Sequence, residues 1–121
     1  MRYEHAYYLT KDRSLEVEFL LLHLSPTRGW RAYILSDIDY KRVSPSRSTA
    51  IYDIHRLTET RNERYIDSER PYPYVCWNQT IHDLDTMKNV CAVWSEITAY
   101  YIRHGGSFSS IQRKLSAQGV I

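Results

Sequence analysis

Glycine, proline and cysteine are all scarce in this chain, which has four, four and two of them among 121 residues. The few glycines form no glycine-rich loop of the kind that cradles a phosphate group. The two cysteines, Cys76 and Cys91, stand far apart and belong to no C-x-x-C unit. This arrangement predicts two buried free thiols rather than a zinc site or a redox pair.

A strong charge of either sign is also lacking, because 16 basic and 14 acidic residues leave a formal net charge of +2. So small a charge creates no strong field for binding a nucleic-acid duplex or an anionic membrane. Uninterrupted apolar runs, such as residues 19–22, are far shorter than a membrane span. Arg2, Glu4 and His5 argue against a secretory leader. We therefore expect a cytoplasmic protein that does not associate with membranes.

Arginine, tyrosine and tryptophan are, by contrast, well represented. Twelve arginines outnumber four lysines, and the chain has eleven tyrosines and three tryptophans. These three residue types are enriched among the side chains that dominate the binding energy of protein interfaces. Tyrosine is also common in β-sheets, so a purely structural use of the tyrosines is an equally good interpretation.

Alternation of apolar and polar residues predicts three strands, over residues 2–9, 15–24 and 30–35. In the second strand, one apolar face is made by Leu15, Val17, Phe19 and Leu21. From residue 20 onward both faces are apolar, so this part of the strand should be covered on both sides. The turn before the third strand contains Pro26 and Gly29, which act as breakers. Such short connections favour an antiparallel meander.

The second half of the chain predicts helices. Apolar residues recur every three or four positions over 84–103, with Asp83 as N-cap and Gly105 at the C-terminal end. Ser107 or Ser109 can cap a short second helix that runs to Leu115. With further strands at 51–57 and 74–77, we predict one α+β domain over residues 1–121. Its four- to five-stranded antiparallel sheet carries the long helix on one face, followed by the short terminal helix.

Only one short motif suggests catalysis. Asp39 and Lys41, separated by one residue, match the end of a metal-dependent nuclease site, and Glu16 or Glu18 could supply the further acid that Mg²⁺ needs. Such tripeptides also arise by chance at the charged end of a strand. The five histidines are scattered without metal-ligand spacing, and no G-x-S-x-G nucleophile motif is present. We expect a non-enzymatic protein with no catalytic residue, metal or cofactor.

The long connection over residues 37–70 offers the best candidate surface. Its part from 43 to 49 has no apolar periodicity and no acid, and a connection this long is usually functional or mobile. A solvated insertion without a role is the other interpretation. The outer face of the long helix, around Lys88, Glu96 and Arg103, is a second candidate surface. The predicted partner-binding residues are Tyr40, Lys41, Arg42, Arg47, Arg56, Arg61, Arg64 and Tyr65.

Several short segments near the C-terminus carry a resemblance. They are Tyr-Val-Cys-Trp at residues 74–77, Leu-Asp at 84–85, Val-Trp at 93–94 and Tyr-Tyr-Ile-Arg-His-Gly-Gly at 100–106. Over the last fifty residues or so, the chain resembles short, uncharacterised proteins carried by bacterial prophages and conjugative elements. The resemblance implies a mobile-element accessory protein, a group in which anti-CRISPR and other anti-defence inhibitors are prominent. It carries over no catalytic or binding residues.

Together, these observations predict an inhibitor of a bacterial defence machine that works by binding a protein partner. The resemblance implies that the partner is an RNA-guided nuclease or another host-defence protein. The alternative is a small nucleic-acid-binding protein or a metal-dependent nuclease, since basic residues also stand beside aromatic ones at Tyr40–Arg42 and Arg64–Tyr65. The sequence does not decide between a monomer and a homodimer.

Overall fold

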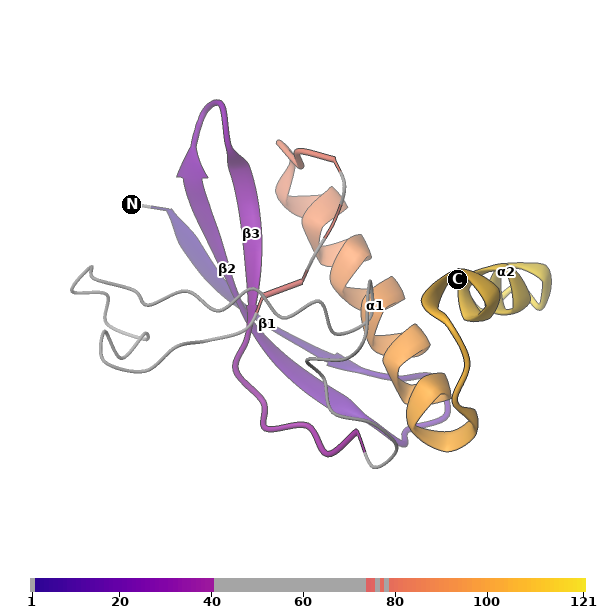
Figure 1. Cartoon of the computed structure of the whole chain (residues 1–121). Coiled ribbons are helices and arrows are strands. Elements are labelled where there is room, and N and C mark those ends of the chain that lie inside the picture. The colour runs from indigo at the N-terminus through magenta and orange to yellow at the C-terminus, as the bar shows by residue number, and fades with distance from the viewer. Residues whose placement is uncertain (1, 41–73, 76, 78) are drawn as a thin grey trace.

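The computed structural model describes residues 2–40, 74, 75, 77 and 79–121 of the chain. Over these residues the protein has three strands followed by two helices, shown in Figure 1. The elements are β1 (Tyr3–Leu9), β2 (Glu16–Ser25), β3 (Gly29–Ile34), α1 (Leu84–His104) and α2 (Phe108–Ala117). The α+β class and all five elements were predicted, with α1 one residue and α2 two residues longer at the C-terminal end.

The three strands form one antiparallel sheet in the order β1-β2-β3, which confirms the predicted meander. The prediction of four to five strands is wrong, because the described part of the chain has three. The proposed strand at 74–77 is reduced to an isolated bridge between Tyr74 and Tyr33. Beside it, the Val75 N–H donates to the Ala32 carbonyl at 2.9 Å. These contacts are too few for a continuous ladder, and the proposed strand at 51–57 lies outside the described residues.

Helix α1 begins and ends at the predicted caps. The Asp83 side chain accepts a hydrogen bond from the Thr86 N–H at 2.9 Å. At the other end Gly105 has a φ of 74°, and its N–H donates to the Tyr101 carbonyl at 2.8 Å. Helix α2 begins with a capping box in which Ser107 and Ser110 satisfy each other's backbone N–H groups. Local capping therefore sets the length of both helices.

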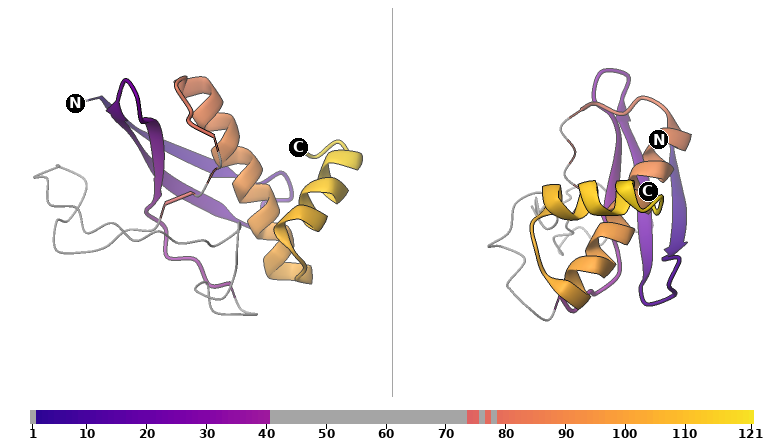
Figure 2. Two further views of the ribbon diagram at one scale, coloured as in Figure 1. Left: turned by 45° about the horizontal axis from the view of Figure 1, so that its top comes forward. Right: turned by 90° about the vertical axis from the view of Figure 1, so that its right-hand side faces the viewer.

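Helix α1 covers one face of the sheet and forms the main core. Val17, Phe19 and Leu21 of β2 pack there against apolar residues of α1, including Met87 and Trp94. Trp94 is 1% exposed, and its ring meets that of Phe19 edge-to-face at a centroid distance of 6.0 Å. Figure 2 shows α2 on the side of α1 away from the strands, and α2 contacts α1 but no strand. The fold is thus a stack of sheet, long helix and short helix.

Two smaller apolar clusters complete the packing. Between the helices lie Ile97, Tyr101, Ile111, Leu115 and Tyr40. On the sheet face opposite α1, a further cluster is made by Leu20, Leu22 and Tyr33, which confirms that this part of β2 is buried on both sides.

Cys91 is a buried free thiol, and burial raises its pKa to about 12. Cys76 lies outside the described residues. Neither described helix is long and apolar enough to cross a lipid bilayer.

Candidate functional site

Of the eight predicted partner-binding residues, the structure describes Tyr40 alone. Its side chain is 7% exposed and packs with Ile97 and Tyr101 in the cluster between the helices. Burial raises the pKa of Tyr40 to about 12. The ring therefore stabilises the fold and presents little surface to a partner. Outside the described residues lie Lys41, Arg42, Arg47, Arg56, Arg61, Arg64 and Tyr65, whose role stays a prediction.

The residues of the nuclease alternative are only partly described. The Glu18 carboxylate accepts a hydrogen bond from the Tyr7 hydroxyl at 3.1 Å and lies 3.4 Å from Nδ1 of His5. Asp39 is exposed, and Lys41 lies outside the described residues. Within the part of the chain that the structure describes, no three His, Cys, Asp or Glu side chains are grouped so that they could hold a metal ion. Glu18 is engaged by β1 instead.

Glu96 does not lie on an outer face of α1, which corrects the second candidate surface. The residue is 7% exposed, and its carboxylate accepts hydrogen bonds from the Tyr8 hydroxyl at 2.6 Å and the Lys11 N–H at 3.0 Å. Burial and the neighbouring carboxylate together raise the pKa of Tyr8 to about 12. Glu96 thus fastens the middle of α1 to the end of β1.

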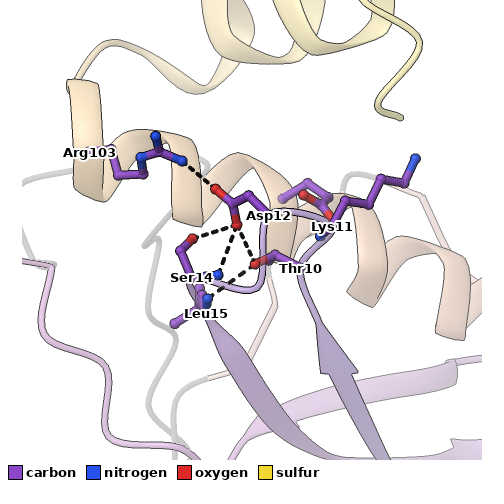
Figure 3. A network of polar contacts seen from close by, with 7 residues as sticks. Thr10, Lys11, Asp12, Ser14, Leu15 and Arg103 are labelled. Atoms are coloured by element: carbon purple, nitrogen blue, oxygen red, sulfur yellow. Dashed lines mark hydrogen bonds and ion pairs between the residues drawn. The ribbon is translucent and has the colours of Figure 1, made fainter.

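Asp12, in the turn between β1 and β2, makes a second set of polar contacts, which also reaches α1 (Figure 3). Its carboxylate accepts from the Ser14 hydroxyl at 2.6 Å, the Ser14 N–H at 2.9 Å and the Thr10 hydroxyl at 2.9 Å. It also pairs with the Arg103 guanidinium from the last turn of α1. The Ser14 bonds, with help from Thr10 and Arg103, hold the pKa of Asp12 well below its usual range.

The third residue of this candidate surface, Lys88, pairs with Glu4 of β1. All three residues of the surface, Lys88, Glu96 and Arg103, thus contact β1 or the turn after it. The three positions recur at intervals of about two helical turns, so they form one stripe along α1. We call this set of contacts the paired end of the sheet, defined by Glu96 and Arg103 of α1 with Tyr8 and Asp12. Its charged and polar groups satisfy one another and bind the helix to the hairpin.

The opposite end of the sheet carries a groove. A cavity of about 310 Å³ lies between β3 and the chain from Tyr74 to Ile81. We call it the arginine groove. It is lined by Leu24, Arg28, Trp30, Arg31, Ala32, Tyr74, Val75, Trp77, Gln79, Thr80, Ile81 and Met87. Among the residues that the structure describes, two arginines and no acidic residue line it, so these residues carry a positive charge that the overall net charge of +2 does not suggest.

The backbone at Gly29 holds the two walls of the groove together. Gly29 has a φ of 69°, a conformation that side chains disfavour, and an added Cβ would lie 2.3 Å from the Ile81 carbonyl oxygen. That same oxygen accepts a hydrogen bond from the Trp30 N–H at 2.8 Å. Glycine at this position therefore lets residues 79–81 sit directly against the start of β3.

The aromatic rings of the groove serve mainly as supports. The Arg31 guanidinium lies 4.0 Å from the centroid of the Tyr74 ring, a cation–π stacking distance. Trp30 is 7% exposed and has Arg2 at 5.2 Å and His23 at 5.2 Å from its ring. Within the described residues, neither Arg28 nor Arg31 makes an ion pair. The arginine groove is thus a built site with hydrogen-bond donors to offer.

The sequence prediction missed this groove. The segment Arg28–Gly29–Trp30–Arg31 was a usable signal, because it concentrates two arginines and a tryptophan around a turn. Its partner wall comes from residues 74, 75, 77 and 79–81, far away in the sequence, so the enclosure itself had no local signature. Comparisons of the chain with protein-family models, with curated proteins and with solved structures found no match.

Proposed function

We propose that this protein is a non-enzymatic binding protein that acts on a protein partner. More specifically, we propose that it inhibits a bacterial defence machine in the manner of an anti-CRISPR protein. The partner would be an RNA-guided nuclease or another host-defence protein in the cytoplasm. The observation that supports protein binding best is the arginine groove, where Arg28 and Arg31 lie beside aromatic rings and pair with no acidic residue of the described part of the chain.

The use of the acidic side chains supports the same proposal. Glu96 accepts two hydrogen bonds that join α1 to β1 and the turn after it. Asp12 accepts three hydrogen bonds within that turn and pairs with Arg103 of α1. A general base or metal ligand needs a carboxylate that is free to meet substrate or metal. We therefore assign these two carboxylates to the stability of the fold, and we assign recognition to the groove arginines, which pair with no described acid.

Phage plating tests the inhibitor proposal directly. The protein is expressed in bacterial strains that each carry one defence system, and each strain is challenged with a phage which that system restricts. We expect plating to be restored in at least one strain, and not by the empty vector. Restriction that stays intact in every strain would contradict inhibition.

The alternative function predicts different results in assays with the purified protein. If Asp39 and Lys41 belong to a nuclease, the purified protein alone should cut DNA or RNA when Mg²⁺ is present. If the protein binds nucleic acid, its mobility shift should weaken steeply with salt. Either result with the protein alone would replace the proposed function with the alternative. We expect neither cleavage nor a tight shift.

The predicted surface at residues 40–65 has its own test. We expect the double substitution Arg42→Glu with Arg47→Glu to abolish inhibition. Exposed substitutions usually cost less than about 0.5 kcal/mol each, so the melting temperature should stay within a few degrees. Full inhibition by this variant would remove these arginines from the partner-binding surface. A large loss of stability would show that they support the fold.

A further inference from the structure

We propose that the arginine groove binds an acidic peptide segment of the partner, with a carboxylate held by Arg31 and Arg28. This inference rests on the proposed protein-binding function and names the chemistry that the partner presents. Three features of the groove carry it: the stacked Arg31 guanidinium, the aromatic rings that already contact other side chains, and a partly apolar lining.

Arg31 is positioned before any ligand arrives. Its guanidinium lies 4.0 Å from the centroid of the Tyr74 ring, and Tyr74 is itself held against Tyr33 at a centroid distance of 6.0 Å. Stacking covers one face of the guanidinium but leaves the N–H groups along its edge free to donate. A planar fork of N–H donors fits the two oxygens of a carboxylate. Little side-chain entropy is then lost on binding, because the side chain is already ordered.

Arg28 supplies a second charge at the mouth of the groove. It is exposed in the turn between β2 and β3, and its own N–H donates to the Ser25 hydroxyl at 3.0 Å, which fixes the backbone there. No acidic residue is among the described residues that line the groove, so none of these residues would repel an incoming carboxylate. Charge complementarity therefore favours a ligand with negative charge.

The aromatic rings argue against a nucleobase as the ligand. Base recognition on single strands depends on open ring faces for stacking. Here Arg31 stacks on Tyr74, while Arg2 and His23 lie against Trp30. Trp77 meets Phe108 edge-to-face at 6.5 Å. The rings are thus engaged inside the fold, and the guanidinium edges are the main groups left to bind a ligand.

Most of the groove surface is polar, but a smaller part of its lining is apolar, and this part favours a peptide over a phosphodiester chain. Ala32, Val75, Ile81 and Met87 all line it and are at most 6% exposed. A cavity of about 310 Å³ is at the small end of ligand pockets, which suits one or two side chains. The expected ligand therefore carries an acidic side chain next to an apolar one.

Calorimetric titration of the full chain tests the inference with a defined probe. The probe is a short, end-blocked peptide of alternating acidic and leucine residues, at low salt. Its controls are the same peptide with Gln and Asn in place of the acids, and an oligothymidylate of equal charge. We expect the acidic peptide to bind at least about tenfold more tightly than either control, because only it offers carboxylates beside apolar groups.

Charge-matched variants locate the binding. Arg28→Glu and Arg113→Glu change the net charge equally, but Arg113 is exposed on α2 and lines no part of the groove. We expect Arg28→Glu to weaken peptide binding at least about tenfold, and Arg113→Glu by less than about twofold. Arg31→Ala should behave like Arg28→Glu, and Arg31→Lys should recover only part of the affinity because a lysine lacks the planar fork. Circular dichroism checks that every variant is folded.

Several outcomes would overturn the inference: equal weakening by Arg28→Glu and Arg113→Glu, no preference for the acidic peptide, or tighter binding of the oligothymidylate. The plating test distinguishes a failure of the groove inference from a failure of the proposed function. If the protein inhibits a defence system and Arg28→Glu leaves inhibition unchanged, the groove inference fails and the function stands. If the groove binds the peptide but no strain is protected, the groove inference stands and the inhibitor proposal fails.

Discussion

The two ends of the antiparallel sheet use charged residues in opposite ways. At the paired end, Glu96 and Arg103 of α1 each meet a partner from β1 or the turn that follows it. At the other end, Arg28 and Arg31 line a groove in which no other described residue is charged. Within the described residues, the same small sheet therefore carries one set of charges that is paired and another that is not.

This difference indicates how stability and recognition are divided in the chain. A buried carboxylate such as Glu96 is tolerated only because its hydrogen bonds replace those lost from water. Arginines at a surface groove cost the fold little, because water still reaches them. We therefore expect substitutions at the paired end to change the free energy of unfolding. Substitutions of the groove arginines should change binding instead.

We expect the largest effect on stability in the apolar core between the sheet and α1, which both ends of the sheet share. Trp94 is 1% exposed and packs against Phe19 beneath the middle of the sheet. We expect Trp94→Ala to lower the free energy of unfolding by about 3–5 kcal/mol, measured by urea denaturation. Trp77→Ala is the matched control, because this half-buried tryptophan should cost clearly less. Equal losses would mean that the core is not centred on Trp94.

The next largest effect concerns the backbone of the groove. Gly29 and Gly119 have nearly the same φ, 69° and 74°, but an added Cβ meets the Ile81 oxygen at residue 29 and nothing within 4 Å at residue 119. A non-glycine residue in a disfavoured backbone conformation costs about 1–3 kcal/mol, so Gly119→Ala measures that cost alone. We expect Gly29→Ala to lower the free energy of unfolding by more than Gly119→Ala does.

Equal values for the two alanine variants would contradict the close approach of residues 79–81 to β3. A larger loss at residue 29 should also weaken the groove, because the clash pushes its two walls apart. The urea midpoints of the two variants, measured side by side, give the comparison provided that both unfolding curves have the same slope.

Sequence patterns predicted the elements well and the contacts between them poorly. The alternation in residues 15–24 and the spacing over 84–103 located β2 and α1, because burial of one face imposes a period on the sequence. Glu96 was placed on the outside of α1, since a charged residue at the border of an apolar stripe usually faces water. Its partner Tyr8 belongs to a strand 88 positions earlier, and no local signal connects the two.

The groove was missed for the same reason. Gly29 was interpreted as a turn breaker, but the structure shows that it also makes room for the Ile81 carbonyl. Tyr40 was expected at a surface, because the loop that follows it is polar, but the ring itself packs against Ile97. In each case the deciding contact joins residues that are far apart in the sequence.

Removing the central acid of the paired end should have an intermediate effect. In Glu96→Ala, the Tyr8 hydroxyl and the Lys11 N–H both lose their acceptor. Leaving a buried polar group unsatisfied costs about 1–3 kcal/mol, so we expect a loss of that size in urea denaturation. Glu96→Gln keeps an acceptor oxygen and should lose less. Glu16→Gln, at an exposed position of β2, is the control and should have little effect.

High pH should weaken the paired end in a defined range. Tyr8 has its pKa raised from 10.0 to about 12 in the folded protein. A raised pKa means that the neutral form is favoured by folding, so its contribution is complete below pH 10 and is lost between pH 10 and 12. We expect Tyr8→Phe to be less stable than the unsubstituted chain at neutral pH. The gap between them should narrow as the pH rises, and a constant gap would contradict the Tyr8–Glu96 contact.

The most direct test of the account compares one charge reversal at each end of the sheet. Arg103→Glu places a carboxylate opposite Asp12, whereas Arg28→Glu alters an exposed residue of the groove. Each variant is measured for its free energy of unfolding and for its affinity toward the acidic peptide. An exposed ion pair is worth up to about 1 kcal/mol, so Arg103→Glu should lose roughly that much or somewhat more and keep its affinity.

For Arg28→Glu we expect the opposite pattern. Its free energy of unfolding should change by less than about 0.5 kcal/mol, while its affinity for the acidic peptide should fall at least about tenfold. If both substitutions lowered stability and affinity alike, or if Arg103→Glu were the one that lost peptide binding, the division between a paired end and a binding end would be wrong.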